Sequence, residues 1–299
     1  MTIFLVVLLC IGLIGYLAQT TGLCMVRGVN EAVTGKPLFL LAILFSGVFS
    51  WVSVLSAQLL DLPIPFASYE VGLWAVFGGF LFGLGAALNN GCGVSTISKL
   101  ARGQLGMLAT VSGWLLGWLL LTLWAPERRA LEIAIPEEIH YGILVVLSIL
   151  IMIGLVFLSP SNRKIWLGML TIGLLAGFAF LYEPKWTPSG LLKDISYSTW
   201  NGDHAIWPST ERFLIIIALI AGMIIAAVRT RSFVFNIPRW HVFVMHLFAG
   251  VLMGIGAAIA SGGNDSQLLL ALPALSPAGL VTVLAMLGGI YAGRKINML

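Results

Sequence analysis

Residues 79–102 read GFLFGLGAALNNGCGVSTISKLAR, and this stretch decides how the chain is expected to fold. A glycine-rich apolar segment runs into the polar sequence Asn89-Asn90-Gly91-Cys92-Gly93, and a short amphipathic segment follows it. Backbone that leaves the helical conformation inside a membrane is tolerated only where protein or a water-filled cavity satisfies its N–H and C=O groups. The stretch therefore predicts a re-entrant hairpin that handles something polar within the membrane, with Cys92 at its centre.

The composition places this hairpin in a multi-pass membrane protein. Of the 299 residues, 59% are hydrophobic and 9% are charged, whereas roughly 25% of the residues of an ordinary soluble domain are charged. The net charge of +4 does not indicate nucleic-acid binding, because the basic residues are spread over short loops instead of forming one patch. The chain has no P-loop, CxxC pair or zinc-ligand spacing, so we expect no direct use of ATP, no metal and no cofactor.

Nine segments are long and apolar enough, or nearly so, to cross a bilayer, since a transmembrane helix needs about 20 apolar residues. The sequence therefore predicts an all-α polytopic membrane protein of about nine transmembrane helices, forming a single transmembrane domain over residues 1–299. The N-terminal run has no basic n-region and no clear cleavage site, so we interpret it as the first retained span. The spans are expected at roughly 3–18, 38–60, 71–88, 104–125, 140–158, 165–181, 211–228, 240–260 and 278–293.

Lysine and arginine residues are distributed unequally over the two ends of these spans. Of the 16, eleven lie at the end that includes the C-terminus. The positive-inside rule then places the C-terminus in the cytoplasm and the N-terminus outside. The five basic residues of the outer end are Arg128, Arg129, Lys185, Lys193 and Arg212. Three tryptophans near the same end are expected to be interfacial anchors, namely Trp186, Trp200 and Trp207.

The glycine-rich segment occurs twice in the chain. Residues 79–91 and 250–262 share 7 of 13 residues at a constant offset of 171 positions. Five spans separate the two copies, and this odd number turns the second copy over in the membrane. We therefore predict two inverted repeats, at about 1–125 and 165–299, joined by a linker span at about 140–158. Inverted repeats with broken helices place substrate sites near the middle of the bilayer, although such glycines also serve close helix packing.

Four polar breaks follow from this arrangement, and each is predicted to form a short re-entrant hairpin. Two of them, residues 19–28 and the opening stretch, enter from the cytoplasmic side, and two, 183–210 and 261–266, enter from outside. The N-terminus of a half helix attracts anions, glycine lets a ligand approach the backbone, and a thiol adds a soft, polarisable group. The predicted substrate path consists of Cys24, Cys92, Asn90, Gly91, Gly93, Gly262, Gly263 and Asn264.

Several of the polar residues have a structural alternative. Cys24 and Cys92 are also suited to be small core residues, and Asn90 suits a helix cap as well as a path lining. Asp265 is expected to be an N-cap rather than a ligand. His246 lies inside a predicted span, where an ionisable group is a functional candidate, and we expect a neutral histidine bonded to a neighbouring helix.

The pattern GxxxGxGAAxxxGCG over residues 79–93, followed by Ser/Thr and a half helix with Lys99 and Arg102, resembles the YeeE/YedE family of sulfur-transport membrane proteins. The segments TGLCMVRG (21–28) and GVLMGIGAAIASGGN (250–264) fit the same family, so the resemblance covers both repeats. It implies a bacterial inner-membrane protein that takes up thiosulfate or a related small sulfur-containing anion. It also implies a central path whose cysteines, here Cys24 and Cys92, relay the anion by S–H···S hydrogen bonds, and a cytoplasmic sulfur-carrier protein as partner.

The sequence departs from the family at one place. The second-half break of the family commonly carries a third cysteine, whereas residues 262–264 are Gly-Gly-Asn here. A related sulfur species, a selenium species or another small anion therefore stays open as the substrate. Two other functions also stay open, although we expect a transporter and not an enzyme. One is an intramembrane thiol oxidoreductase or sulfurtransferase that uses Cys24 and Cys92, and the other is a non-transporting subunit that docks a soluble protein on Arg229, Arg231 and Arg239.

Overall fold

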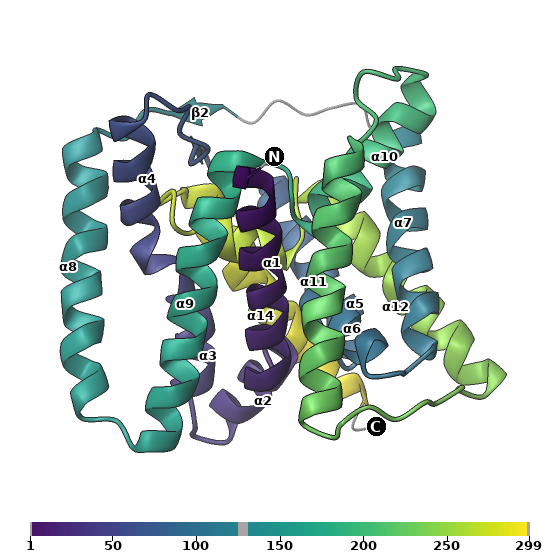
Figure 1. The fold of residues 1–299 in the computed structure, drawn as a ribbon. Helices are drawn as coiled ribbons and strands as arrows, with labels where there is room; N and C mark the ends of the chain where they lie inside the picture. The colour runs from purple at the N-terminus through teal and green to yellow at the C-terminus, as the bar shows by residue number, and fades with distance from the viewer. Residues whose placement is uncertain (1, 125–130, 298–299) are drawn as a thin grey trace.

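The computed structural model describes residues 2–124 and 131–297, and its ribbon is helical almost throughout (Figure 1). Within these residues, nine stretches of helix are long and apolar enough to cross a membrane. The sheet of the described part is a single antiparallel pair, β1 (Ser68–Tyr69) with β2 (Glu132–Ile133). The chain is thus an all-α polytopic membrane protein, as predicted. Arg128 and Arg129, which entered the charge count, lie outside the described residues.

Most spanning helices begin and end within a few residues of the expected positions. An exception is α9, which starts at Pro160 rather than near 165, because Ser159 caps it and proline suits the first helical position. Eight uninterrupted helices make up spans in the described residues: α1 (Thr2–Thr21), α5 (Leu73–Leu88), α7 (Gly106–Trp124), α8 (Glu137–Val156), α9 (Pro160–Tyr182), α11 (Thr210–Arg229), α12 (Trp240–Ile259) and α14 (Pro277–Asn297).

The second expected span, 38–60, differs from the others because its helix is interrupted. It consists of α3 (Leu38–Leu44), the 3-10 turn η1 (Ser46–Phe49) and α4 (Ser50–Leu59). The interruption lies where the backbone meets other elements: a methyl group on Gly47 would overlap Pro273, and one on Gly173 of α9 would overlap the Ser46 carbonyl. A 3-10 segment inside a helix often marks a hinge or a strained site, and here it coincides with this crowded crossing.

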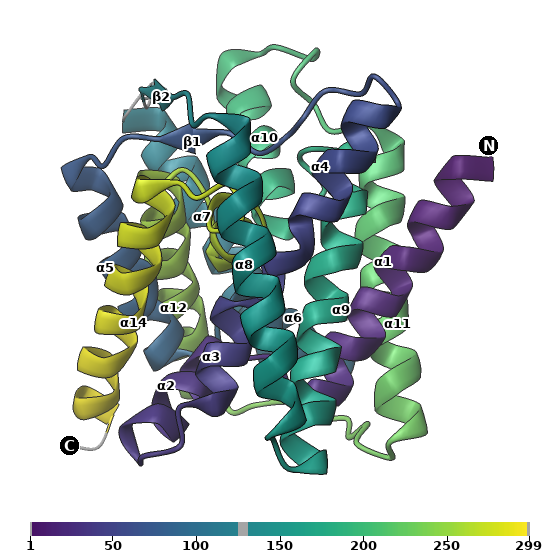
Figure 2. The same cartoon turned by 90° about the vertical axis from the view of Figure 1, so that its left-hand side faces the viewer.

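Short helices follow four of the spanning helices at the predicted breaks. Both views place α2 at the end of the molecule that holds the C-terminus, and α10 at the end that holds the N-terminus (Figures 1 and 2). Entry of these elements from opposite membrane faces, and the two-fold relation of the repeats, stay predictions. The short elements are α2 (Met25–Val33), α6 (Gly93–Ala101), α10 (Pro188–Asn201), and α13 (Asn264–Ser266) with the π-turn η2 (Gln267–Ala271).

Two helix pairs form the most extensive packing, α5 with α14 and α7 with α12. Glycine lets the backbones of each pair approach closely. A methyl group on Gly83 would overlap the Met286 carbonyl, and one on Gly254 would overlap the Trp114 carbonyl. Small residues at helix crossings are a usual basis of helix association in membranes. Because Gly83 and Gly254 occupy the same position in the two glycine-rich copies, the expectation that these glycines serve packing is confirmed.

Candidate functional site

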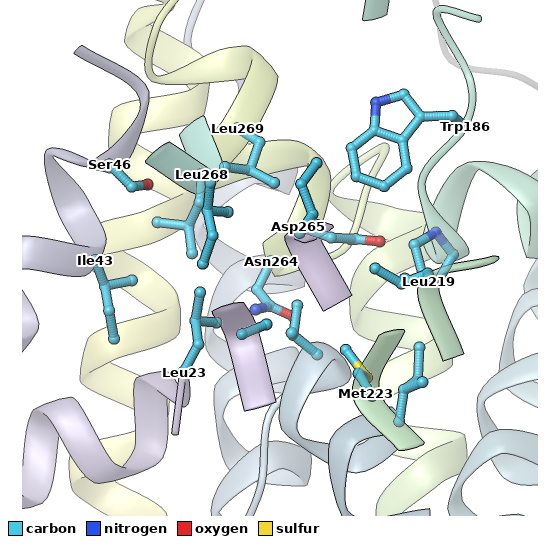
Figure 3. Close-up of a pocket in the computed structure, with 16 residues that line it drawn as sticks. Leu23, Ile43, Ser46, Trp186, Leu219, Met223, Asn264, Asp265, Leu268 and Leu269 are labelled. Carbon is cyan, nitrogen blue, oxygen red and sulfur yellow. The ribbon is translucent and has the colours of Figure 1, made fainter. Parts of the chain in front are cut away.

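A cavity of about 40 Å³ lies in the middle of the molecule, between helices of both halves of the chain (Figure 3). Its wall combines side chains of α1, α3 and α6 with side chains of α9, α11 and the break after α12. A buried water molecule needs roughly 10–15 Å³ on this measure, so the cavity has room for about three. The wall is mostly apolar, and its polar groups are those of Ser46, Asn264 and Asp265 and the indole N–H of Trp186.

Cys24 and Cys92 lie against each other beside this cavity. Each is the extended residue directly before a half helix, Cys24 before α2 and Cys92 before α6. Their thiols interact with each other, and Ser95 Oγ donates to Cys92 Sγ at 3.6 Å and also interacts with the Cys24 thiol. Both cysteines are buried and free. The neighbouring residues Leu23 and Val94 line the cavity, whereas Cys24 and Cys92 themselves do not belong to its wall.

Lys99 brings a positive charge to this pair. Its ammonium donates to the Asn90 carbonyl at 2.8 Å and interacts electrostatically with both thiols. Arg102, on the next turn of the chain, adds a second positive charge close to Lys99. Clefts that carry one sign of charge concentrate ions of the opposite sign. The thiol pair therefore lies next to a region that attracts anions.

Asn90 and Gly91 form the turn between α5 and α6. Asn90 is exposed and has a left-handed backbone with φ of 51°, and Ser261, at the equivalent position of the second copy, has φ of 60°. Asparagine tolerates this conformation better than most residues. Gly91 is buried, and a methyl group there would lie 2.8 Å from Ser95 Oγ. Neither residue belongs to the wall of the cavity.

The buried side-chain amide of this break belongs to Asn89, which is not among the residues predicted for the substrate path. Its Nδ2 donates to the Gly91 carbonyl at 3.0 Å and to Thr96 Oγ1 at 2.7 Å. Its Oδ1 accepts from Thr110 Oγ1 at 2.7 Å and from His246 Nδ1 at 2.8 Å. His246 is thus bonded to a neighbouring helix, as expected, and its Nδ1 carries the proton, because an amide oxygen only accepts.

A signal for Asn89 was present in the helical periodicity. Phe82, Gly85 and Asn89 are spaced by three and four residues, so they share one face of α5, and all three are buried. Asn90 falls one position later, off that face. The helical periodicity therefore predicts that Asn89, and not Asn90, lies on the buried face.

Replacing Asn89 by leucine is expected to lower the free energy of unfolding by roughly 1–3 kcal/mol for each buried partner it leaves unpaired. Thr110 and His246 would be the main groups affected. Thermal unfolding of the purified protein in detergent measures the loss. Asn90→Gly is the matched control, because the side chain is exposed and glycine accepts a positive φ, so a change below about 0.5 kcal/mol is expected there. Equal losses for the two variants would contradict the assignment.

Gly93 and Asn264 connect the two halves of the chain. The Gly93 N–H donates to Asn264 Oδ1 at 3.1 Å. Each residue opens its half helix, α6 or α13, and the two positions are 171 residues apart, which equals the offset of the repeat. The Asn264 Nδ2 group is buried and has no hydrogen-bond partner among the described residues. A buried donor left in this state costs about 1–3 kcal/mol.

Asp265 caps a helix, but a different one from the helix of its own break. Its Oδ2 accepts from the Ser189 N–H at 2.9 Å, and its Oδ1 accepts from Ser189 Oγ at 2.6 Å. Ser189 lies in the first turn of α10, so the carboxylate compensates the positive end of that helix. Gly262 and Gly263 are buried behind it, and a methyl group on Gly263 would lie 2.7 Å from Asp265 Oδ1.

The expectation that Trp186 anchors at the membrane surface is wrong. Its side chain is 3% exposed, lines the cavity and packs on Phe180 with ring centroids 5.4 Å apart. Trp186 lies in the break between α9 and α10, at the deep end of the half helix, and this position explains its burial. Trp200 and Trp207, farther along the same segment, are exposed.

Comparison with known proteins gives one consistent result. The model of the Sulphur transport family matches the chain twice, over residues 21–163 and 157–292. The chain is 22% identical to the Thiosulfate transporter TsuA of Escherichia coli (strain K12), over 95% of this chain and 92% of that protein. It is 25% identical to the Thiosulfate transporter TsuA of Spirochaeta thermophila, over 67% of this chain and 70% of that protein. The two matches of one family model follow the two halves of the chain.

Proposed function

The chain belongs to the Sulphur transport family, that of the YeeE/YedE proteins, and from this premise we propose that it takes up thiosulfate across the bacterial inner membrane. It is a transporter of a sulfur-containing anion and not an enzyme. Thiosulfate is the first candidate substrate because two relatives are named thiosulfate transporters. A related sulfur or selenium species is the alternative, because the second-half break carries Asn264 in place of a cysteine.

The observation that carries the proposal is the contact between the thiols of Cys24 and Cys92 beside the central cavity. Both sulfurs lie at the N-terminal ends of half helices, where unpaired N–H groups favour negative charge. The terminal sulfur of thiosulfate is a soft acceptor, and a thiol is a soft donor that matches it. Lys99 adds attraction for the whole anion. The anion passes from one thiol to the other by exchange of hydrogen bonds, with no covalent step.

The glycines of the breaks complete this path. Gly91 and Gly93 at the first-half break and Gly262 and Gly263 at the second lack a Cβ, so an anion can pass close to their backbone. The N–H groups of Gly91, Gly93 and Gly262 already donate within the chain, to Ala86, Asn264 and Ala257. Asn90 lies at the exposed turn next to Gly91, and its carbonyl accepts from Lys99, so an anion drawn to Lys99 also reaches Asn90.

The distribution of charge supports uptake in one orientation. Loops between α2 and α3, α8 and α9, and α11 and α12 lie at the end of the molecule that holds the C-terminus (Figures 1 and 2). Lys36, Arg231 and Arg239 of these loops belong to the eleven of 16 lysine and arginine residues that the sequence assigns to this end. By the positive-inside rule this end faces the cytoplasm and the N-terminus faces the periplasm. A sulfur-carrier protein that accepts the product would bind at the cytoplasmic end.

Uptake of radiolabelled thiosulfate by cells that carry this protein as their thiosulfate transporter tests the proposal. We expect the initial rate to fall at least tenfold for Cys24→Ala and for Cys92→Ala, because each removes one of the two sulfur-binding donors. Cys10→Ala is the matched control, since Cys10 lies within α1, is half-buried and takes no part in the contact between Cys24 and Cys92. Its rate should equal that of the unaltered protein.

Each contrary result has its own meaning. Normal uptake by both alanine variants would remove the thiol pair from the mechanism. No uptake by the unaltered protein would remove thiosulfate as the substrate, and competition with a selenium analogue in the same cells would then identify the alternative.

A further inference from the structure

Asn264 holds a hydrogen-bond donor that the fold leaves without a partner at the wall of the central cavity. The residue is 0% exposed, it lines the cavity, and its Nδ2 group has no partner among the described residues. Figure 3 shows its amide among the apolar side chains of the wall, with the nitrogen on the side of Leu23. Buried amides are normally paired, so this one needs an explanation.

The orientation of this amide is fixed by chemistry. The Gly93 N–H only donates, so the group that faces it at 3.1 Å must be the oxygen of Asn264. The NH₂ group therefore points away from Gly93. A second polar residue of the wall, Asp265, is already engaged, because both of its oxygens accept hydrogen bonds from Ser189. The NH₂ group of Asn264 is thus a free neutral donor in mostly apolar surroundings. Asn264 contacts Gly93, which is the residue that follows Cys92.

We propose that Asn264 binds an oxygen of the transported anion while the sulfur end of that anion faces the Cys24–Cys92 pair. This inference rests on the proposed function and adds the feature that selects the substrate. A thiol pair by itself would bind any soft anion, and an amide N–H donor by itself would bind any oxyanion. Together they favour a small oxyanion that also carries a terminal sulfur or selenium. A neutral donor suits a transport site, because binding must stay weak enough for release.

The sharpest variant is Asn264→Asp, which has the same shape and keeps the oxygen that accepts from Gly93. A purely structural role for residue 264 predicts less protein in the membrane, because a second carboxylate is buried beside Asp265, and an unchanged KM in the protein that remains. The proposed role predicts that the KM for thiosulfate rises at least tenfold, because the donor is lost and a negative charge meets the anion. Asn264→Leu removes the donor without adding charge, and the same direction is expected. Both are compared with the unaltered protein at equal amounts in the membrane.

A second measurement needs no variant and decides the matter if these two proteins fail to accumulate. Methanesulfonate keeps the three oxygens of thiosulfate and replaces the terminal sulfur by a methyl group. We expect it to inhibit thiosulfate uptake competitively in the unaltered protein, through its oxygens at Asn264. Absence of inhibition at a hundredfold excess would overturn the inference.

The outcomes separate this inference from the function on which it rests. Uptake by the unaltered protein with an unchanged KM in Asn264→Asp overturns the role of Asn264 and leaves thiosulfate transport in place. A raised KM in both variants, with normal protein amounts, supports the role. No uptake by the unaltered protein removes the proposed function and the inference with it.

Discussion

Asp194→Leu is expected to lower the free energy of unfolding by about 3–5 kcal/mol, because it leaves the guanidinium of Arg212 buried without its carboxylate. Arg212 Nη1 lies 2.7 Å from Asp194 Oδ2, and both side chains are about 5% exposed. Arg212 also donates to the Lys185 carbonyl at 2.7 Å, and Glu183 lies 3.9 Å from its Nε. These contacts join α10 and the break before it to α11, so the loss should also displace Trp186 and the cavity wall.

Thermal unfolding of the purified protein in detergent measures this effect, together with the amount of protein in the membrane. The double variant Asp194→Leu with Arg212→Met removes both charges and should recover most of the loss, because no unpaired charge is then buried. Glu31→Ala is the control, since the Arg27–Glu31 pair is exposed and worth below about 1 kcal/mol. If Asp194→Leu and Glu31→Ala cost the same, the buried pair does not fix α10 on α11.

Gly289→Ile is expected to prevent stable assembly of α14 on α5. A methyl group on Gly289 would overlap the Phe80 carbonyl and lie 3.0 Å from Gly83 Cα. Overpacking of a core usually costs roughly 1–3 kcal/mol. The cost should exceed that range here, because the opposing atoms are backbone and have no other rotamer. We expect little full-length protein in the membrane.

The neighbouring residue provides the control for this prediction. Gly288 belongs to the same helix, and nothing lies within 4 Å of a methyl group placed on it. Gly288→Ile should therefore accumulate normally. Quantification of both variants in membrane fractions checks the difference, and normal accumulation of Gly289→Ile would show that the two helices can separate without loss of the fold.

The positions of the spans could be predicted from the sequence because hydropathy alone sets them. The positions of the breaks could be predicted because glycine and asparagine interrupt the apolar runs. The broken second span was missed, since its cause is a contact of residues 46 and 47 with α9 and Pro273, which are distant in sequence. The placement of Trp186 was wrong for a similar reason: a tryptophan near a loop was taken to face the membrane surface. Only the depth of its half helix shows that it is buried.

The candidate site was predictable in part. The cysteines were selected by their polar, glycine-rich surroundings, and the family membership of the chain supports their selection. The contact between Gly93 and Asn264 depends on the three-dimensional arrangement of both halves. The predicted inverted repeat gave a hint, because residues near the axis of such a repeat contact their own equivalents, and these two are separated by the repeat offset. The sequence could not show which helix Asp265 caps, because its partner Ser189 belongs to another break, 76 residues earlier in the chain.

The residues at the N-termini of the half helices differ between the two halves of the chain, and this difference bears on which substrate is bound. In the first half, the helix N-termini carry thiols and lie near Lys99. In the second half, Thr187 and Gly263 hold the equivalent places, and a carboxylate already occupies the N-terminus of α10. Under the proposed function, an anion that reaches the cavity meets the amide of Asn264 at the wall, and the thiols lie beyond Leu23 and Val94 on the first-half side.

The small volume of the central cavity has a consequence for speed. A space for about three water molecules cannot hold a hydrated oxyanion, so each ion must shed its water and wait until the surrounding helices part. Throughput is then set by how often those helices separate, as in proteins whose turnover is limited by conformational steps. Under the proposed function, the uptake rate is therefore expected to depend on temperature and on the stiffness of the surrounding lipid.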